Sequence, residues 1–224
     1  MDRLPPLASG FPPADEAAWR ALVAKTLKDR PAETLNTRLS PGVEVAPLYV
    51  PDAQAAPLIG PRDAARPWDV RTLVRQSDLA QANQDALEDL AGGAASVILR
   101  IDPAGENGVA VASAEGLAQA LQGVVLELAP VGLDAGFLGP QAADWLHTVA
   151  KSSPAALLQL HLDPLSAFAG TGASPGPVES HLISAANVAA RLAQTYPKAN
   201  LFMASGRVVH EAGGDAAGEL AFAA

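Results

Sequence analysis

The sequence predicts an α/β fold in which an extended N-terminal arm precedes a parallel sheet. Residues 1–66 are rich in proline and carry one helical pattern, whereas from Pro67 onward short apolar runs alternate with helical segments. A connection between parallel strands needs a crossover of a dozen or more residues, and the helical segments provide it. Of the 224 residues, 49% are hydrophobic, which is enough to bury a core.

The predicted arm domain, residues 1–66, contains one helix. Asp15 can cap a helix that runs to about Lys28, and Pro31 closes it. The alternating run at residues 43–46 predicts a short edge strand or hairpin arm among many prolines and glycines. Four apolar residues recur at helical spacing in the helix: Trp19, Leu22, Val23 and Leu27.

The predicted barrel domain, residues 67–224, contains five strands and five helices in alternation. The apolar runs predict strands at residues 68–74, 96–101, 124–129, 156–162 and 200–205. The predicted helices cover residues 77–91, 114–121, 141–150, 178–194 and 215–224.

Two parallel architectures compete for this pattern, an open doubly wound sheet and a TIM (β/α) barrel. Residues 74–77, which follow the first predicted strand, contain no glycine, so the phosphate-binding turn of dinucleotide folds is missing. A TIM-barrel-like fold is therefore favoured. A closed barrel has eight units in about 250 residues. With only about five β/α units here, we predict an incomplete barrel that is part of a larger assembly.

Composition excludes several classes of function. The chain has no cysteine, which excludes a disulfide scaffold and a thiol nucleophile. Its 24 acidic residues outnumber 15 basic ones, so a nucleic-acid partner is not expected. No apolar run approaches the roughly 20 residues of a membrane span, and the N-terminus lacks the apolar core of a secretory signal. We expect a cytoplasmic protein without a membrane partner.

Two histidines are candidate catalytic residues. His161 precedes Asp163 at the end of the fourth predicted strand, and the carboxyl ends of barrel strands form active sites. His210 follows the fifth strand, where its ring could act as a general acid. The alternatives are that Asp163 caps the next segment while His161 fills the rim, and that Glu211 caps a helix while His210 is satisfied locally.

Two arginines are candidate substrate-binding residues. Arg71 and Arg100 lie on the first two predicted strands, where each needs a partner or a solvated end. Pairing with Asp69 or Asp102 is the alternative to a ligand role. His147 and His181 have no carboxylate or histidine at metal-ligand spacing, so no metal site is expected.

Several strings of the sequence, taken in order, resemble the methylmalonyl-CoA mutase family. The resemblance is closest to the small, non-catalytic subunit of the bacterial heterodimeric enzyme and covers nearly the whole chain from Phe11. The strings are residues 11–16 with Trp19, residues 68–71, 87–90, 96–102, 162–164, 210–213 and 219–221.

The resemblance implies a partner-wrapping arm, a TIM barrel and an isomerase that interconverts methylmalonyl-CoA and succinyl-CoA. In the assembled family enzyme adenosylcobalamin supplies the radical chemistry, and a CoA ester enters the barrel of the catalytic chain. Where that chain carries a substrate-contacting tyrosine, this sequence has Leu73. Where it carries Gly-Tyr-His, this sequence has Gly206, Arg207 and Val208. The cobalamin-ligating Asp-x-His-x-x-Gly signature is absent.

Three functions remain open at this point. The first is a small-subunit-like chain that binds no cofactor itself and supports a catalytic mutase subunit. The second is the CoA-ester-binding half of an active mutase. The third is a structural module without CoA chemistry that self-associates through the open edge of the strand at residues 200–205.

Overall fold

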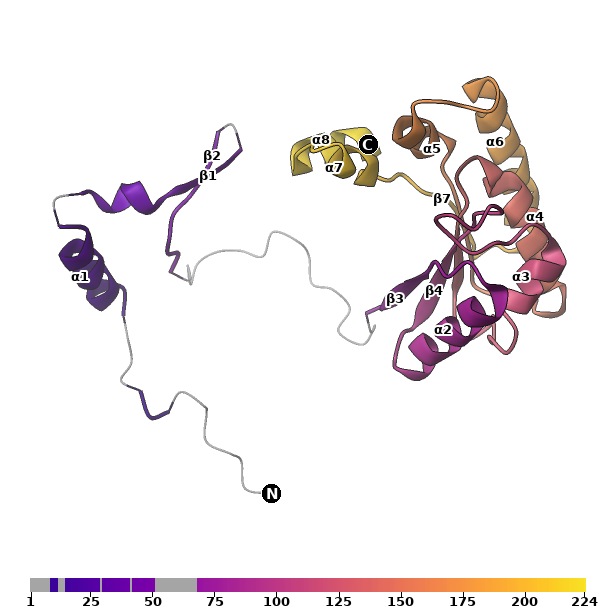
Figure 1. The fold of residues 1–224 in the computed structure, drawn as a ribbon, viewed down its shortest axis with the longest axis horizontal. Helices are drawn as coiled ribbons and strands as arrows, with labels where there is room; N and C mark the ends of the chain where they lie inside the picture. The colour runs from indigo at the N-terminus through magenta and orange to yellow at the C-terminus, as the bar shows by residue number, and fades with distance from the viewer. Residues whose placement is uncertain (1–8, 12–14, 29, 41, 51–67) are drawn as a thin grey trace. The chain divides into compact units, whose positions relative to one another are not determined.

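The computed structural model describes residues 9–11, 15–28, 30–40, 42–50 and 68–224 (Figure 1). The Pro-rich segments expected at residues 1–8 and 51–67, and part of the string at residues 11–16, lie outside the described residues. The chain divides into two compact units, Met1–Ala64 and Ala65–Ala224.

The first unit contains the predicted helix and a small hairpin. Helix α1 (Glu16–Leu27) begins after Asp15, whose carboxylate accepts a hydrogen bond from the Ala18 amide at 2.7 Å. A 3₁₀ turn, η1 (Ala32–Leu35), leads into strand β1 (Thr37–Ser40), which pairs antiparallel with β2 (Val43–Val45). The hairpin predicted around residues 43–46 is thus present.

The second unit is built on a five-stranded parallel sheet. Its strands follow one another in chain order and every adjacent pair is parallel. A doubly wound sheet would reverse its order part-way, whereas a barrel keeps it. The predicted α/β fold of the incomplete TIM-barrel type is confirmed, and no closed barrel forms among the described residues. The strands are β3 (Arg71–Val74), β4 (Ser96–Arg100), β5 (Val131–Asp134), β6 (Leu158–Leu162) and β7 (Asn200–Phe202).

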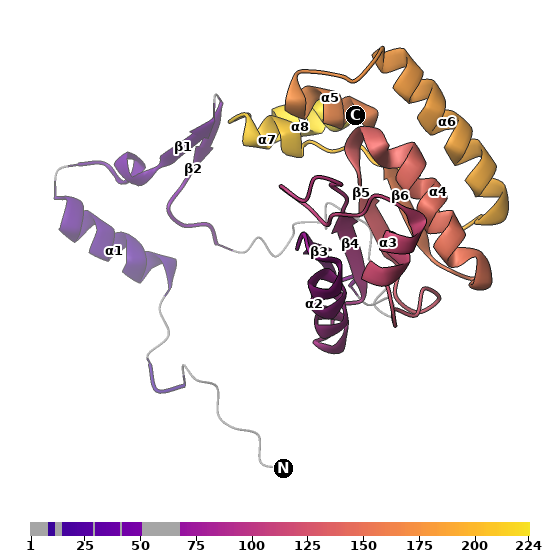
Figure 2. The same cartoon turned by 45° about the vertical axis from the view of Figure 1, so that its right-hand side comes forward.

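Four helices cover one face of this sheet (Figures 1 and 2). They lie side by side in chain order: α2 (Leu79–Ala91), α3 (Ala114–Ala120), α4 (Gly139–Val149) and α6 (Val178–Thr195). Helices α2, α4 and α6 contact the strands, and α3 packs between α2 and α4. Short elements follow the carboxyl ends of the strands: η2 (Gly136–Leu138), α5 (Pro164–Thr171), α7 (Arg207–Glu211) and α8 (Ala216–Ala223), while η3 (Ala150–Ser152) ends α4.

The core lies between the sheet and these helices. Val97 and Leu99 of β4 are fully buried, as are Val131 and Leu133 of β5. Because successive side chains of a strand alternate between faces, the residues between them project from the opposite face. Register places Ile98 beside Gly132 and Arg100 beside Asp134 on that second face. The four helices leave this face uncovered, and it carries the candidate site.

The prediction of a strand at residues 124–129 is wrong. This segment forms turns in which Val125 and Leu128 stay exposed, and the third strand of the sheet is β5, Val131–Asp134. A short strand that contains Gly132 carries a weak sequence signal, since glycine is disfavoured in strands. Pairing with β4, and not local apolarity, fixes its position.

Two short helices at the carboxyl edge are absent from the sequence prediction. Helix α5 begins with Pro164 after the cap Asp163 and ends at Gly172 in the left-handed conformation, φ 67°. Those are ordinary helix-boundary signals in a segment too short to show apolar periodicity. Helix α7 contains Glu211 in its last turn, so the expectation that Glu211 caps the start of a helix is wrong. Among the described helices, none combines the length and apolarity required to cross a membrane.

Candidate functional site

A cleft of about 720 Å³ opens at the carboxyl ends of the parallel strands, on the face that the four helices leave uncovered. We call it the carboxyl-end cleft. Ligand sites of parallel α/β folds form at this edge because the loops that follow the strands converge there. Its lining comes from β3 and β4 (Leu73, Ile98, Arg100, Ile101), from the segment after β4 (Asp102, Pro103, Asn107), from β5 and η2 (Asp134 to Leu138), from β6 and α5 (His161, Asp163, Ser166, Ala167, Gly170, Thr171), and from residues after β7 (Met203, Ser205, Arg207, Val208, Glu211).

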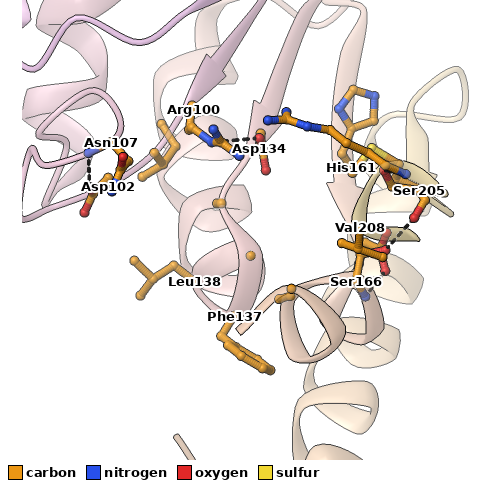
Figure 3. A pocket seen from close by; sticks show the side chains of 18 of the residues that line it. Arg100, Asp102, Asn107, Asp134, Phe137, Leu138, His161, Ser166, Ser205 and Val208 are labelled. Atoms are coloured by element: carbon orange, nitrogen blue, oxygen red, sulfur yellow. Dashed lines mark hydrogen bonds and ion pairs between the residues drawn. The ribbon is translucent and has the colours of Figure 1, made fainter. Parts of the chain in front are cut away.

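The two arginines that line the cleft are each held by a carboxylate. Arg100 Nε lies 3.2 Å from Asp134 Oδ2, across the β4–β5 ladder (Figure 3). Arg207 Nε lies 2.7 Å from Glu211 Oε1, one turn along α7. The prediction that Arg100 pairs with Asp102 is therefore wrong, because register brings Asp134 beside it.

Asp102 instead shapes the loop after β4. Its carboxylate accepts hydrogen bonds from the Asn107 amide at 2.8 Å and the Ala104 amide at 3.1 Å. These backbone amides, that of Asn107 foremost, hold the pKa of Asp102 below its usual range. A β-carbon at Gly108 would lie 2.5 Å from the Arg100 carbonyl oxygen, so only glycine allows the loop to return this closely to β4.

His161 lies in a β-bulge of β6 with an unusual backbone. The pairing of β6 with β7 shifts register between Gln159 and Leu162, and His161 has φ 48°, which is uncommon for a residue other than glycine. Its ring lies over Gly132: a β-carbon there would be 3.0 Å from His161 Cε1 and from Ile98 Cγ1. Burial, and then the charge of Arg71, lower the pKa of His161, so the imidazole is neutral at pH 7.

Asp163 forms part of the cleft lining at the start of α5. Its Oδ1 accepts a hydrogen bond from the Ser166 amide at 2.9 Å, and Ser166 Oγ donates to the Ser205 carbonyl at 3.3 Å. The residue is 9% exposed, and its Oδ2 has no hydrogen-bond partner. Asp163 is therefore a buried carboxylate with only one of its two oxygens satisfied.

Of the four candidate site residues predicted from the sequence, two line the carboxyl-end cleft and two do not. His161 and Arg100 both line the carboxyl-end cleft. Arg71 does not line it: its guanidinium pairs with Asp69, as the sequence analysis allowed, and donates to Ser96 Oγ at 2.8 Å. His210 is 71% exposed on α7 and its Nδ1 lies 3.0 Å from Glu219 Oε1, outside the cleft lining.

Four lining residues were missed by the sequence analysis as site residues. Asp134 was hidden because its strand was misplaced, and Ser166 because α5 was not predicted. Arg207 was noted only for its place in the family pattern and Glu211 for that place and as a possible helix cap, and their helix α7 was not predicted. The signal for Asp163 was present, since it follows a strand and precedes a proline.

A family model and three curated relatives indicate the same protein family for this chain. The family model described as methylmalonyl-CoA mutase matches residues 62–224. The chain belongs to the methylmalonyl-CoA mutase family. Over 96% of its length it is 32% identical to the methylmalonyl-CoA mutase small subunit of Streptomyces virginiae, and over 97% it is 31% identical to the small subunit of Propionibacterium freudenreichii subsp. shermanii.

A more distant relative is a probable mitochondrial methylmalonyl-CoA mutase of Caenorhabditis elegans, 26% identical over 91% of the chain. The chain spans about a third of the length of these relatives, with shares of 37%, 36% and 32%. The resemblance to the mutase family, small subunits included, is confirmed.

The sequence lacks the Asp-x-His-x-x-Gly signature that the family resemblance associates with cobalamin, and the described histidines form no evident substitute for it. A cobalt-ligating histidine needs a free ring nitrogen facing a large open site. Two of the histidines are engaged elsewhere: His147 Nδ1 lies 3.2 Å from the Tyr196 hydroxyl, and His181 packs on Phe137 with ring centroids 4.6 Å apart. His210 Nδ1 lies 3.0 Å from Glu219 Oε1, and none of the four histidines lies in the Asp-x-His-x-x-Gly pattern. Within the described part of the chain no three His, Cys, Asp or Glu side chains cluster to hold a metal ion.

Proposed function

We propose that this chain is a small-subunit-like segment of a methylmalonyl-CoA mutase that supports a catalytic partner and does not itself isomerise CoA esters. The observation that carries the proposal is the charge of the carboxyl-end cleft. Four carboxylates line it, those of Asp102, Asp134, Asp163 and Glu211, against two guanidinium groups that are already paired.

This charge balance opposes a CoA ester. Methylmalonyl-CoA and succinyl-CoA carry phosphates and a free carboxylate, and binding them requires donors or cations that are free to pair with anions. The charges of Arg100 and Arg207 are already offset by Asp134 and Glu211, so an incoming anion would meet a cleft whose net charge is negative. The half-buried His161 is neutral and offers no compensating charge.

Two apolar side chains support the same proposal. Leu73 and Val208 both line the cleft. They stand where the family resemblance leads one to expect, in a catalytic chain, a substrate-contacting tyrosine and the histidine of a Gly-Tyr-His run. A leucine and a valine can pack against a ligand, but neither can donate a hydrogen bond or transfer a proton.

The homology to small subunits suggests the partner. Both bacterial relatives are named as small subunits, which implies that each assembles with another subunit. We place adenosylcobalamin, which would supply radical chemistry to the assembled enzyme, outside the described residues of this chain, because the Asp-x-His-x-x-Gly signature is absent.

Size-exclusion chromatography of this chain mixed with a catalytic mutase subunit tests the proposal. We expect the two to elute as one complex at micromolar concentration. Two separate peaks would contradict the subunit role.

Isothermal titration with succinyl-CoA tests the charge argument separately. The unmodified chain should give no saturable heat, while the double variant Asp134→Asn/Glu211→Gln, which leaves both arginines without an anionic partner, should bind measurably. Saturable binding to the unmodified chain would favour the CoA-ester-binding alternative.

A further inference from the structure

We infer that the carboxyl-end cleft is a binding site for an organic cation, an ammonium or guanidinium group carried on an apolar stem. The inference concerns what the cleft accepts, and it does not depend on the subunit role proposed above. It stands on three observations: an unsatisfied buried carboxylate, a surplus of negative charge and apolar walls.

The buried carboxylate is that of Asp163. Its Oδ1 is satisfied by the Ser166 amide, but its Oδ2 has no partner, although the residue is nine-tenths buried. No arginine or lysine forms an ion pair with Asp163 among the described residues, so the Ser166 amide is the only described donor to its carboxylate. A buried charge without a counter-ion is costly, and a cation in the adjoining cleft would offset that cost.

The surplus of negative charge extends beyond Asp163. The guanidinium groups of Arg100 and Arg207 form ion pairs with Asp134 and Glu211, which leaves Asp102 and Asp163 without an ion-pair partner of their own among the described residues. The surrounding unit adds to this field, because residues 65–224 contain 16 acidic residues and eight basic ones. A cleft with walls of low dielectric concentrates such a field and favours a cation inside it.

The walls of the cleft are apolar. Phe137 and Leu138 of η2 and Val208 of α7 are part of the lining (Figure 3). Met203, which follows β7, also lines the cleft. A bare metal ion or a hydrated salt cation gains nothing from such walls. An alkyl stem gains about 0.8 kcal/mol for each methylene group it buries. Because the cleft combines carboxylates with apolar side chains, it favours a cation that carries a hydrocarbon stem.

Two sources carry this chemistry: a free alkylamine, and a lysine or arginine side chain of another polypeptide. Titration of the ¹⁵N-labelled full chain, followed by amide chemical shifts, distinguishes them. The probes are hexylamine, an acetylated and amidated pentapeptide with one central arginine among alanines, and hexanoate as the anionic counterpart of hexylamine.

We expect hexylamine or the peptide to shift the amide signals of Ser166 and Ala167 in a saturable way, while hexanoate does not. The probe that binds more tightly identifies the source. Equal shifts with hexylamine and hexanoate would overturn the inference, because apolar contact alone would then explain binding. Shifts spread over acidic surface residues such as those of α2, without saturation at α5, would also overturn it.

A pair of matched variants tests the role of Asp163. Asp163→Asn removes the charge and keeps a side-chain oxygen that can cap α5. Asp215→Asn makes the same change at the cap of α8, where Asp215 accepts from the Gly218 amide at 2.8 Å outside the cleft lining. Asp163→Asn should weaken cation binding about tenfold, and Asp215→Asn should leave it unchanged. Equal effects of the two variants would show that only overall charge matters and would refute the site. Glu211→Gln, at an exposed position, gives a second test in which the fold is not at risk, and it too should weaken binding.

Discussion

Replacing Gly132 by alanine places a methyl group where two side chains already lie. The new β-carbon would be 3.0 Å from His161 Cε1, 3.0 Å from Ile98 Cγ1 and 3.3 Å from His161 Nδ1. These separations are below the roughly 3.5–4.0 Å at which non-bonded heavy atoms attract one another. Ile98 is held in the β4–β5 ladder and His161 in a bulge at φ 48°, so neither can move freely.

We expect Gly132→Ala to destabilise the barrel unit by about 1–3 kcal/mol, the usual cost of an added methyl in a packed site. For a unit of this size that loss lowers the melting temperature by about 2–12 °C. Calorimetry or circular dichroism of the full chain measures it.

Gly116→Ala on α3 is the matched control. Its new β-carbon would meet nothing closer than 3.6 Å, so it should be neutral or stabilise by up to about 1 kcal/mol. Removing the ring in Gly132→Ala/His161→Ala should recover part of the loss, since Ile98 remains. A Gly132→Ala protein as stable as the unmodified chain, or a loss that is the same with and without the His161 ring, would refute this packing argument.

Three further predictions concern the same edge of the sheet. Because the pKa of His161 is lowered in the fold, the unfolded chain binds a proton more readily at this residue. Its contribution to stability is therefore intact above about pH 6.5 and is lost as the pH falls below that value. In urea unfolding between pH 7.5 and 5, His161→Gln should lose less stability than the unmodified chain, and identical pH slopes would contradict the assignment. Asp163→Ala should cost about 1 kcal/mol through loss of the α5 cap, whereas Asp163→Asn should cost little; equal urea midpoints for the two variants would refute the capping role. Gly108→Ala should destabilise more than Gly132→Ala, since its β-carbon would lie 2.5 Å from the rigid Arg100 carbonyl; thermal melts compare the two, and a smaller shift for Gly108→Ala would mean that the loop relaxes.

The order of elements could be predicted from local signals. The apolar run at residues 96–101 and the periodic pattern at residues 178–194 each lie within one element, so the sequence reports them directly. The strand at residues 131–134 could not be found this way. Its glycine is required by the ring of His161, which comes from a different strand, and a short run containing glycine has little local strand preference.

The candidate site was predictable only in part. The position of His161 and Asp163 at the end of a predicted strand pointed to the carboxyl edge, because all parallel strands end at that edge. The partner of Arg100 was not predictable, since Asp134 lies 34 positions later in the chain and becomes its neighbour only through sheet register. His210 shared the same sequence argument as His161, yet the hairpin of α7 and α8 turns it toward Glu219.

The sequence by itself determined the α/β class, the parallel alternation of strands and helices, and the resemblance to methylmalonyl-CoA mutases, because each depends on residue types at short and fixed spacings. Only the tertiary structure decided which charges meet in the carboxyl-end cleft, that Arg100 is paired with Asp134, and that one oxygen of Asp163 is left unsatisfied. These features depend on contacts between residues that are distant in the chain, and such contacts exist only once the strands have aligned.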